Sequence, residues 1–210
     1  MTNHTEPPDV ERLAAALAEV GAIKFGAFRL KLHEQRPEAP LAPLYIDLRV
    51  LRSFPDQMDE AVAAYRQVLA GLEFDLLADV PIASSPFVAI LSHLTRIPMV
   101  TPREPKGHGT GSTVEGVFTP GQTAVVVDDL VTGADSKLEA AHRLESQGLR
   151  VRDIVVLIDR EQGGGEQLAA AGYTLHAAFC LSDLLAIYRR TGVIDDATYE
   201  RVVEYVSATR

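Results

Sequence analysis

The 210-residue chain has no tryptophan, only one cysteine and no long hydrophobic run. A single cysteine, Cys180, excludes an intrachain disulfide and every metal site that needs several cysteines. The apolar runs fall short of the roughly 18 residues that indicate a membrane span. Residues 1–9 lack the basic and apolar regions of a signal peptide. We therefore expect a cytoplasmic protein with no membrane segment.

Positive charge is also scarce. The chain has 20 lysines and arginines against 29 acidic residues, which gives a formal net charge of -9. Nucleic-acid binding depends on clustered Lys and Arg side chains, so we expect no nucleic-acid partner. The hydrophobic content of 47% and the length are instead sufficient for one globular domain with a substantial core.

Short apolar runs alternate with amphipathic stretches over most of the chain. This alternation predicts an α/β fold with a mostly parallel sheet that is flanked by helices on both faces. The predicted strands are 76–80, 98–101, 114–117, 123–127, 151–158 and 174–178. The predicted helices are 55–71, 86–95, 134–147, 166–171, 181–190 and 195–207.

The first third of the chain has a different pattern, and we interpret residues 1–70 as a small N-terminal hood. It would contain a helix at 10–20, two short strands at 25–30 and 44–48, and an exposed loop at 33–43 that holds three prolines. Residues 71–210 would form the parallel-sheet core and the C-terminal helices. We expect both parts to belong to a single domain, 1–210.

The chemically richest stretch is a valine run that ends in Asp128 and Asp129, followed by a small-residue turn, 132–136, that opens a helix. Adjacent carboxylates repel each other unless a polyhydroxyl ligand, a developing cation or Mg²⁺ offsets the repulsion. Backbone N–H groups at the start of a helix can bind an anion. The pattern predicts a site for a sugar that carries phosphate. Taken alone, the two acids fit a solvated strand end followed by a helix cap equally well.

Two further segments carry cations after predicted strands. Arg103, Lys106 and His108 lie in a glycine-rich loop that could close over a polyanion, although a solvated turn explains the same composition. Arg160 follows the strand at 151–158 and offers a planar fork for a carboxylate or an imide. An arginine at a strand end is also commonly an exposed ion-pair partner.

Residues 128–136 resemble the phosphoribosyl pyrophosphate signature of the type I phosphoribosyltransferases. Residues 24–31, 45–49, 97–99 and 155–164 resemble orotate phosphoribosyltransferase in particular, in the form fused within UMP synthase. The resemblance implies the type I phosphoribosyltransferase fold. It also implies Mg²⁺-dependent transfer of ribose 5-phosphate from phosphoribosyl pyrophosphate to orotate, which gives orotidine 5′-monophosphate for pyrimidine biosynthesis, and a homodimer.

The same resemblance assigns roles to single residues. Asp128 and Asp129 would stabilise the cationic ribose, while Lys106 and His108 would act on the departing pyrophosphate. The substrate-binding residues that it implies are Lys31, Tyr45, Arg103, Thr132, Gly133, Ala134, Asp135, Ser136 and Arg160. Magnesium would enter with phosphoribosyl pyrophosphate, and the tandem acids are the candidate protein ligands.

Some positions differ from the family pattern. Ala134 stands where the phosphate loop usually has glycine, and Asp135 places a carboxylate beside it. The mobile loop has Pro102 and Arg103 where two basic residues are usual. These differences leave two other hypotheses open. One is a non-catalytic or regulatory relative that binds a nucleotide or phosphoribosyl pyrophosphate, and the other is a phosphoribosyltransferase for another base.

Overall fold

The computed structural model describes residues 10–30, 32–104 and 113–209. Its centre is a six-stranded sheet with the order β5-β4-β3-β6-β7-β8. All neighbouring strands are parallel except β5, which pairs antiparallel with β4 at one edge. The strands are β3 (Leu76–Asp79), β4 (Met99–Pro102), β5 (Val114–Glu115), β6 (Thr123–Val131), β7 (Arg150–Asp159) and β8 (Thr174–Cys180). The predicted α/β class and mostly parallel sheet are confirmed.

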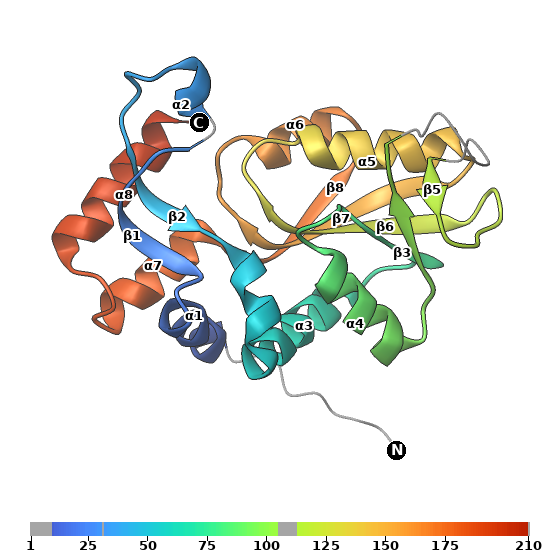
Figure 1. Ribbon diagram of the computed structural model, residues 1–210, viewed down its shortest axis with the longest axis horizontal. Coiled ribbons are helices and arrows are strands. Elements are labelled where there is room, and N and C mark those ends of the chain that lie inside the picture. The colour runs from blue at the N-terminus through green and yellow to red at the C-terminus, as the bar shows by residue number, and fades with distance from the viewer. Residues whose placement is uncertain (1–9, 31, 105–112, 210) are drawn as a thin grey trace.

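Helices cover both faces of this sheet, with α5 and α6 on one face and α3 and α4 on the other (Figure 1). These helices are α3 (Pro55–Leu69), α4 (Ser85–Thr95), α5 (Asp135–Ser146) and α6 (Gly164–Ala170). Because successive side chains of a strand point to opposite faces, β6 contributes to two hydrophobic clusters. Val125 and Val127 pack with residues of α3 and α4, and Val126 packs with residues of α5. The valine run is thus buried on both faces.

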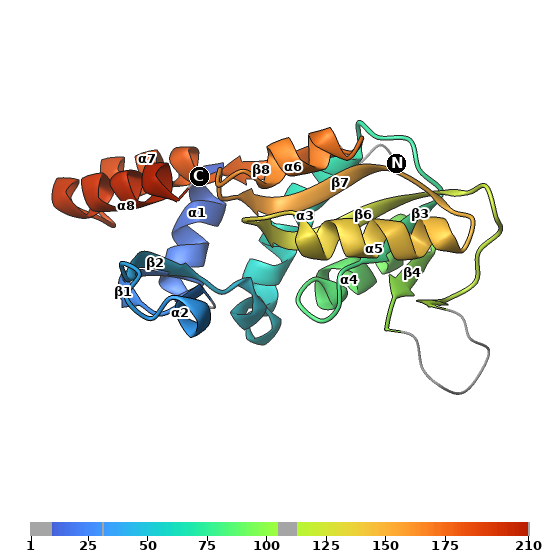
Figure 2. The same cartoon turned by 90° about the horizontal axis from the view of Figure 1, so that it is seen from above.

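A second, two-stranded sheet lies at one end of the molecule (Figure 2). It pairs β1 (Ile23–Phe28) antiparallel with β2 (Ala42–Ile46). Helices from both ends of the chain pack beside it: α1 (Val10–Glu19), α7 (Leu181–Arg190) and α8 (Asp196–Ala208). Buried Tyr188 of α7 ties these ends together, since its hydroxyl donates to the Ala14 carbonyl at 2.8 Å. The domain division at residue 70 stays a prediction.

Two local expectations were wrong. The strand predicted at 123–127 continues to Val131, because Asp128, Leu130 and Val131 still pair with β7. The loop predicted as exposed at 33–43 begins within a short helix, α2 (Leu32–Gln35), and His33 is buried. The backbone satisfies its ring, since Nδ1 lies 2.9 Å from the Leu30 nitrogen, so the imidazole is buried without a polar cost.

Within the described ranges, no helix is both long and apolar enough to cross a membrane.

Candidate functional site

The predicted site residues converge on the edge of the sheet where the parallel strands end. Asp128 and Asp129 lie near the end of β6, Arg160 directly follows β7, and Arg103 directly follows β4. In open α/β sheets, ligands bind at this edge. Three predicted residues, Lys31, Lys106 and His108, lie outside the described residues.

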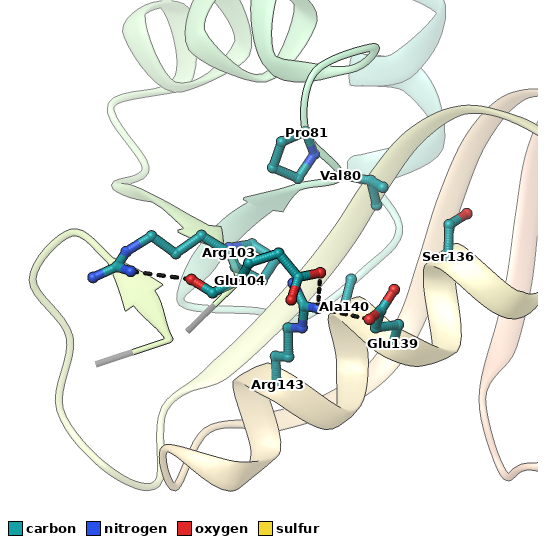
Figure 3. A pocket seen from close by; sticks show the side chains of 9 residues that line it. Val80, Pro81, Arg103, Glu104, Ser136, Glu139, Ala140 and Arg143 are labelled. Carbon is teal, nitrogen blue, oxygen red and sulfur yellow. Dashed lines mark hydrogen bonds and ion pairs between the residues drawn. The ribbon is translucent and has the colours of Figure 1, made fainter. Parts of the chain in front are cut away.

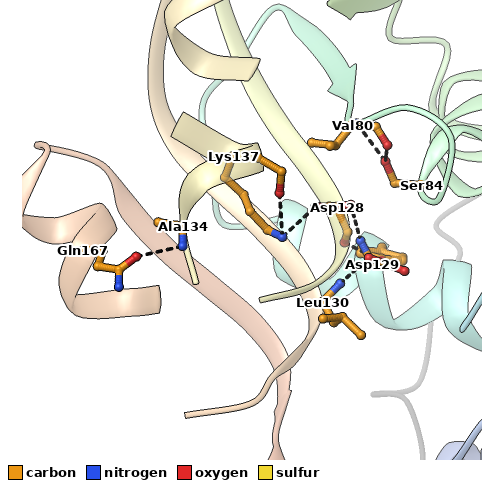
Figure 4. Close-up of polar contacts among 10 residues, drawn as sticks. Val80, Ser84, Asp128, Asp129, Leu130, Ala134, Lys137 and Gln167 are labelled. Atoms are coloured by element: carbon orange, nitrogen blue, oxygen red, sulfur yellow. Dashed lines mark hydrogen bonds and ion pairs between the residues drawn. The ribbon is translucent and has the colours of Figure 1, made fainter. Parts of the chain in front are cut away.

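The tandem acids have different surroundings because they point to opposite faces of the sheet. Asp128 is only 3% exposed. Its Oδ2 lies 2.7 Å from Nζ of Lys137, a buried residue of α5 (Figure 4). Its Oδ1 accepts the backbone N–H of Asp129 at 2.9 Å. Both oxygens of Asp128 are therefore bound by groups of the chain itself.

Asp129 is less enclosed than its neighbour. Its Oδ1 accepts the Leu130 N–H at 2.8 Å, and its carboxyl group lies within hydrogen-bond reach of the Asp128 carboxyl. Burial, followed by the charge of Asp128, raises the pKa of Asp129 to about 7. The backbone of the pair is bound from α3, where the buried Tyr65 hydroxyl donates to the Asp128 carbonyl at 2.7 Å. The arrangement leaves one carboxylate of the pair available to a ligand.

The turn of residues 132–136, called here the phosphate loop, connects β6 to α5. The first-turn amides of α5, including those of Asp135 and Ser136, have no acceptor within the helix and lie at the positive end of its dipole. The Ala134 N–H is instead bound by Oε1 of Gln167 in α6, at 2.9 Å (Figure 4). Gly133 gives the loop a residue without a side chain. The loop can bind an anion with the remaining amides.

A hollow of about 280 Å³ adjoins the phosphate loop between α5, the loop after β3 and the end of β4 (Figure 3). Ser136 lines it, whereas Asp135 lines a different hollow on the outer side of α5. Arg103 also lines it, and its Nε lies 2.8 Å from a Glu115 carboxylate oxygen without hydrogen-bond geometry. The lining residues are Val80, Pro81, Pro102, Arg103, Glu104, Ser136, Glu139, Ala140 and Arg143.

Arg160 is a buried cation with an unsatisfied donor. It is 8% exposed, and burial lowers the pKa of its guanidinium from the ordinary value. Its Nη1 reaches the Thr132 hydroxyl at 3.5 Å, and its Nε has no hydrogen-bond partner among the described residues. A buried, unpaired donor on a cation is costly, so this geometry suits an anionic or acceptor-rich ligand beside the phosphate loop.

Tyr45 lies in β2, away from these residues in the chain's second sheet. Its hydroxyl accepts from Arg49 Nη2 at 3.3 Å, and its ring packs against Phe28 with a centroid distance of 5.7 Å. The described contacts do not join it to Arg160 or to the phosphate loop. Its predicted role in substrate binding stays a prediction.

Sequence reasoning missed two residues that shape the site, Lys137 and Gln167. A signal for the first was present, because Lys137 falls on the apolar stripe of α5 with Ala141 and Leu144, where a lysine must find a buried partner. Gln167 had no comparable signal. Its contact with the phosphate loop joins residues 33 positions apart.

The described residues contain no group of three or more His, Cys, Asp or Glu side chains that could hold a metal ion. This does not conflict with a magnesium ion that arrives with a substrate. Mg²⁺ keeps several waters and commonly uses one or two carboxylates together with substrate phosphates. Asp129, the less buried acid of the tandem pair, fits such a role better than Asp128, which Lys137 binds.

The sheet order, the two acids and the phosphate loop define the class of type I phosphoribosyltransferases. UMP synthase from Leishmania donovani superposes with a TM-score of 0.84 at 32% identity, over 95% of this chain and 42% of that one. Orotate phosphoribosyltransferase from Aeropyrum pernix superposes with a TM-score of 0.71 at 29% identity, over 86% of this chain and 99% of that one.

Curated sequences narrow this class to one family. The chain is 34% identical over 196 residues to orotate phosphoribosyltransferase from Pyrobaculum aerophilum, which covers 92% of this chain and 97% of the relative. The chain therefore belongs to the orotate phosphoribosyltransferase family. It is also 37% identical over 188 residues, 89% of its length, to the bifunctional enzyme PyrF/PyrE of Nostoc sp., of which it spans 38%. No protein-family model matches the chain.

Proposed function

We propose that the chain is an orotate phosphoribosyltransferase, which transfers ribose 5-phosphate from phosphoribosyl pyrophosphate to orotate and so serves pyrimidine biosynthesis. The observation that carries this proposal is Arg160. It is a buried guanidinium with an unpaired Nε, set beside Thr132 at the start of the phosphate loop. Orotate presents a carboxylate and an imide, and a planar guanidinium binds such groups through paired hydrogen bonds. The same position would bring the base close to the sugar phosphate.

The reaction breaks the bond between the anomeric carbon and pyrophosphate and forms a bond from that carbon to a ring nitrogen of orotate. Positive charge builds on the ribose as the first bond breaks, as at other glycosidic centres. A carboxylate in a partly buried position stabilises that charge more strongly than one in water. Asp129 fits this role.

The departing pyrophosphate needs cations. Arg103 lines the hollow beside Ser136, and Lys106 and His108 belong to the undescribed part of the same loop. Magnesium, when bound with phosphoribosyl pyrophosphate, would neutralise part of the phosphate charge. A cytoplasmic location and a homodimer belong to the same proposal. Light scattering of the purified chain would measure its oligomeric state.

The test is an assay of the purified protein with phosphoribosyl pyrophosphate, Mg²⁺ and one base at a time: orotate, uracil, hypoxanthine or adenine. We expect pyrophosphate release and nucleotide formation with orotate. Replacing Arg160 with Gln should raise the KM for orotate about tenfold or more, because a hydrogen bond to a charged group contributes about 1.5–3 kcal/mol. Arg152→Gln is the matched control, since Arg152 is exposed on β7, the strand that Arg160 follows.

Two contacts favour the alternative of a non-catalytic relative. The Ala134 amide is bound by Gln167, and Asp128 is bound by Lys137, so the chain itself occupies two groups at the site. Calorimetry with phosphoribosyl pyrophosphate separates the hypotheses. Binding without turnover of any of the four bases, over the range of pH in which the protein is folded, would reject the enzymatic proposal and support the alternative. Turnover with another base only would reject the orotate specificity alone.

A further inference from the structure

A buried lysine makes the two adjacent acids unequal. Lys137 and Asp128 have side chains that are 6% and 5% exposed, and their charged atoms lie 2.7 Å apart. A buried charge is costly without a partner. Both side chains are shielded from water, so each charge is compensated by the other. Asp128 is thereby held toward α5, on the face of the sheet that Val126 also faces.

The remaining bonding capacity of Asp128 is also used. Its second oxygen accepts the N–H of Asp129 at 2.9 Å. Asp129, by contrast, is only partly buried and has no ion pair like the one between Asp128 and Lys137 among the described residues; its carboxyl group accepts the Leu130 N–H and lies within hydrogen-bond reach of the Asp128 carboxyl. A sugar hydroxyl can therefore bind Asp129 without breaking an ion pair, whereas Asp128 would first have to release Lys137.

Lys137 also touches the phosphate loop. Its Nζ lies 3.3 Å from the Ser136 hydroxyl. Ser136 lines the hollow beside α5 (Figure 3). One ammonium group therefore joins the acid pair to the loop that would bind the sugar phosphate. Loss of its charge would leave the Asp128 carboxylate buried, unpaired and next to Asp129.

We propose that Lys137 is a positioning residue that holds Asp128 away from the sugar, so that Asp129 is the carboxylate of the pair that supports the ribose during transfer. This inference rests on the proposed function. Lys137 acts through Asp128 and the phosphate loop and does not itself contact the reacting atoms.

The test compares Lys137→Met, which keeps an unbranched stem but removes the charge, with the double variant Asp128→Asn/Lys137→Met. Asp128→Asn, Asp129→Asn and the double variant Asp129→Asn/Lys137→Met are assayed beside them. Arg201→Met is the control for loss of one positive charge, because Arg201 is exposed on α8. For each variant, kcat and the KM for phosphoribosyl pyrophosphate are measured separately, and circular dichroism checks the fold.

If Lys137 acts by neutralising Asp128, Lys137→Met should lower kcat/KM about a hundredfold, and the double variant should recover about tenfold or more of that loss. Asp129→Asn should lose kcat without this recovery when combined with Lys137→Met. A merely structural lysine would move stability but would not separate the two acids in kcat. The inference is overturned if the double variant is no more active than Lys137→Met, or if Asp128→Asn alone lowers kcat as much as Asp129→Asn.

Failure of the proposed function can be distinguished from failure of this inference. If the unmodified chain shows no turnover with any base, the same variants are compared by calorimetry with ribose 5-phosphate. Weak binding by Lys137→Met, with recovery in the double variant, would then support the inference while the enzymatic proposal fails. Equal binding by all variants would overturn it. If Lys137→Met does not fold, a folded double variant with measurable binding still supports the pairing, and an unfolded one overturns it.

Discussion

Helix α6 packs so closely against the phosphate loop that a single methyl group should disturb it. A Cβ added at Gly164 would lie 2.4 Å from Val131 Cγ2 and 2.9 Å from the Thr132 carbonyl oxygen. Carbon atoms in contact are normally about 3.5–4.0 Å apart, so α6 would have to move by about 1 Å. The next residue, Gly165, has room, since a Cβ there would lie 3.4 Å from Leu175 Cδ2.

The two single substitutions Gly164→Ala and Gly165→Ala therefore add the same atom to neighbouring positions of one helix. Overpacking a tight contact costs about 1–3 kcal/mol. Alanine in place of glycine within a helix is otherwise favourable by about 0.5–1 kcal/mol. We expect Gly164→Ala to lower the free energy of unfolding by about 1–3 kcal/mol and Gly165→Ala to leave it equal or slightly higher.

A Cβ at Gly164 would also press on Thr132, the first residue of the phosphate loop, so binding of phosphoribosyl pyrophosphate should weaken as well. Chemical denaturation measures the free energy of unfolding, and the KM for phosphoribosyl pyrophosphate measures the state of the phosphate loop. We expect Gly164→Ala to raise this KM about tenfold while Gly165→Ala leaves it unchanged, because misplacement by about 1 Å can cost that much or more. Equal stability and equal KM in the two variants would refute the close packing of α6 on the loop.

Three further predictions concern the acids and their supports. Tyr65→Phe removes the hydroxyl that donates to the Asp128 carbonyl, and it should lower the free energy of unfolding by about 1–3 kcal/mol and also lower kcat. Tyr188→Phe loses a similar buried hydrogen bond, to Ala14, and should lower stability alone. The pKa of Asp129 is raised from 3.8 to about 7. The free energy of unfolding should therefore be unaffected by this group below pH 3.8 and should fall as the pH rises from 3.8 to about 7. In ligand-free and metal-free protein, Asp129→Asn should therefore gain up to about 4 kcal/mol over the parent across that range, at about 1.4 kcal/mol for each unit of pKa, and a difference independent of pH would contradict the raised pKa. Gln167→Leu frees the Ala134 amide but removes the side chain that orients the phosphate loop. We expect the KM for phosphoribosyl pyrophosphate to rise severalfold while kcat is retained. A lowered KM would show instead that Gln167 competes with phosphate for this amide.

The sheet could be predicted because its pattern is local. The valine run before Asp128 is buried on both faces, and such a run with little alternation is typical of a central parallel strand. The end of β6 was harder to predict, since Asp128 is polar and yet pairs with Val156 of β7. The strand continues past the valine run because β7 pairs with it, and the sequence around residue 128 does not reveal this pairing.

The candidate site was predictable where it depends on segments close in sequence and not where it depends on packing between helices. The acids and the phosphate loop belong to one stretch, so their proximity follows from the chain itself. The partners of that stretch come from elsewhere. Gln167 reaches Ala134 from α6, and Tyr65 reaches the Asp128 carbonyl from α3. Neither composition nor spacing indicates which helix face will meet the loop.

The two unusual residues of the phosphate loop are accommodated by its geometry. Ala134 has φ of -90° and ψ of -10°, an ordinary conformation for a residue with a side chain, so this position does not require glycine. Its side chain is fully buried and leaves no methyl group exposed to a ligand. Asp135 is exposed and lines the outer hollow with His142, so its carboxylate points away from the hollow that Ser136 lines. Gln167 binds the backbone N–H of Ala134, and the first-turn amides of α5 are left for the phosphate.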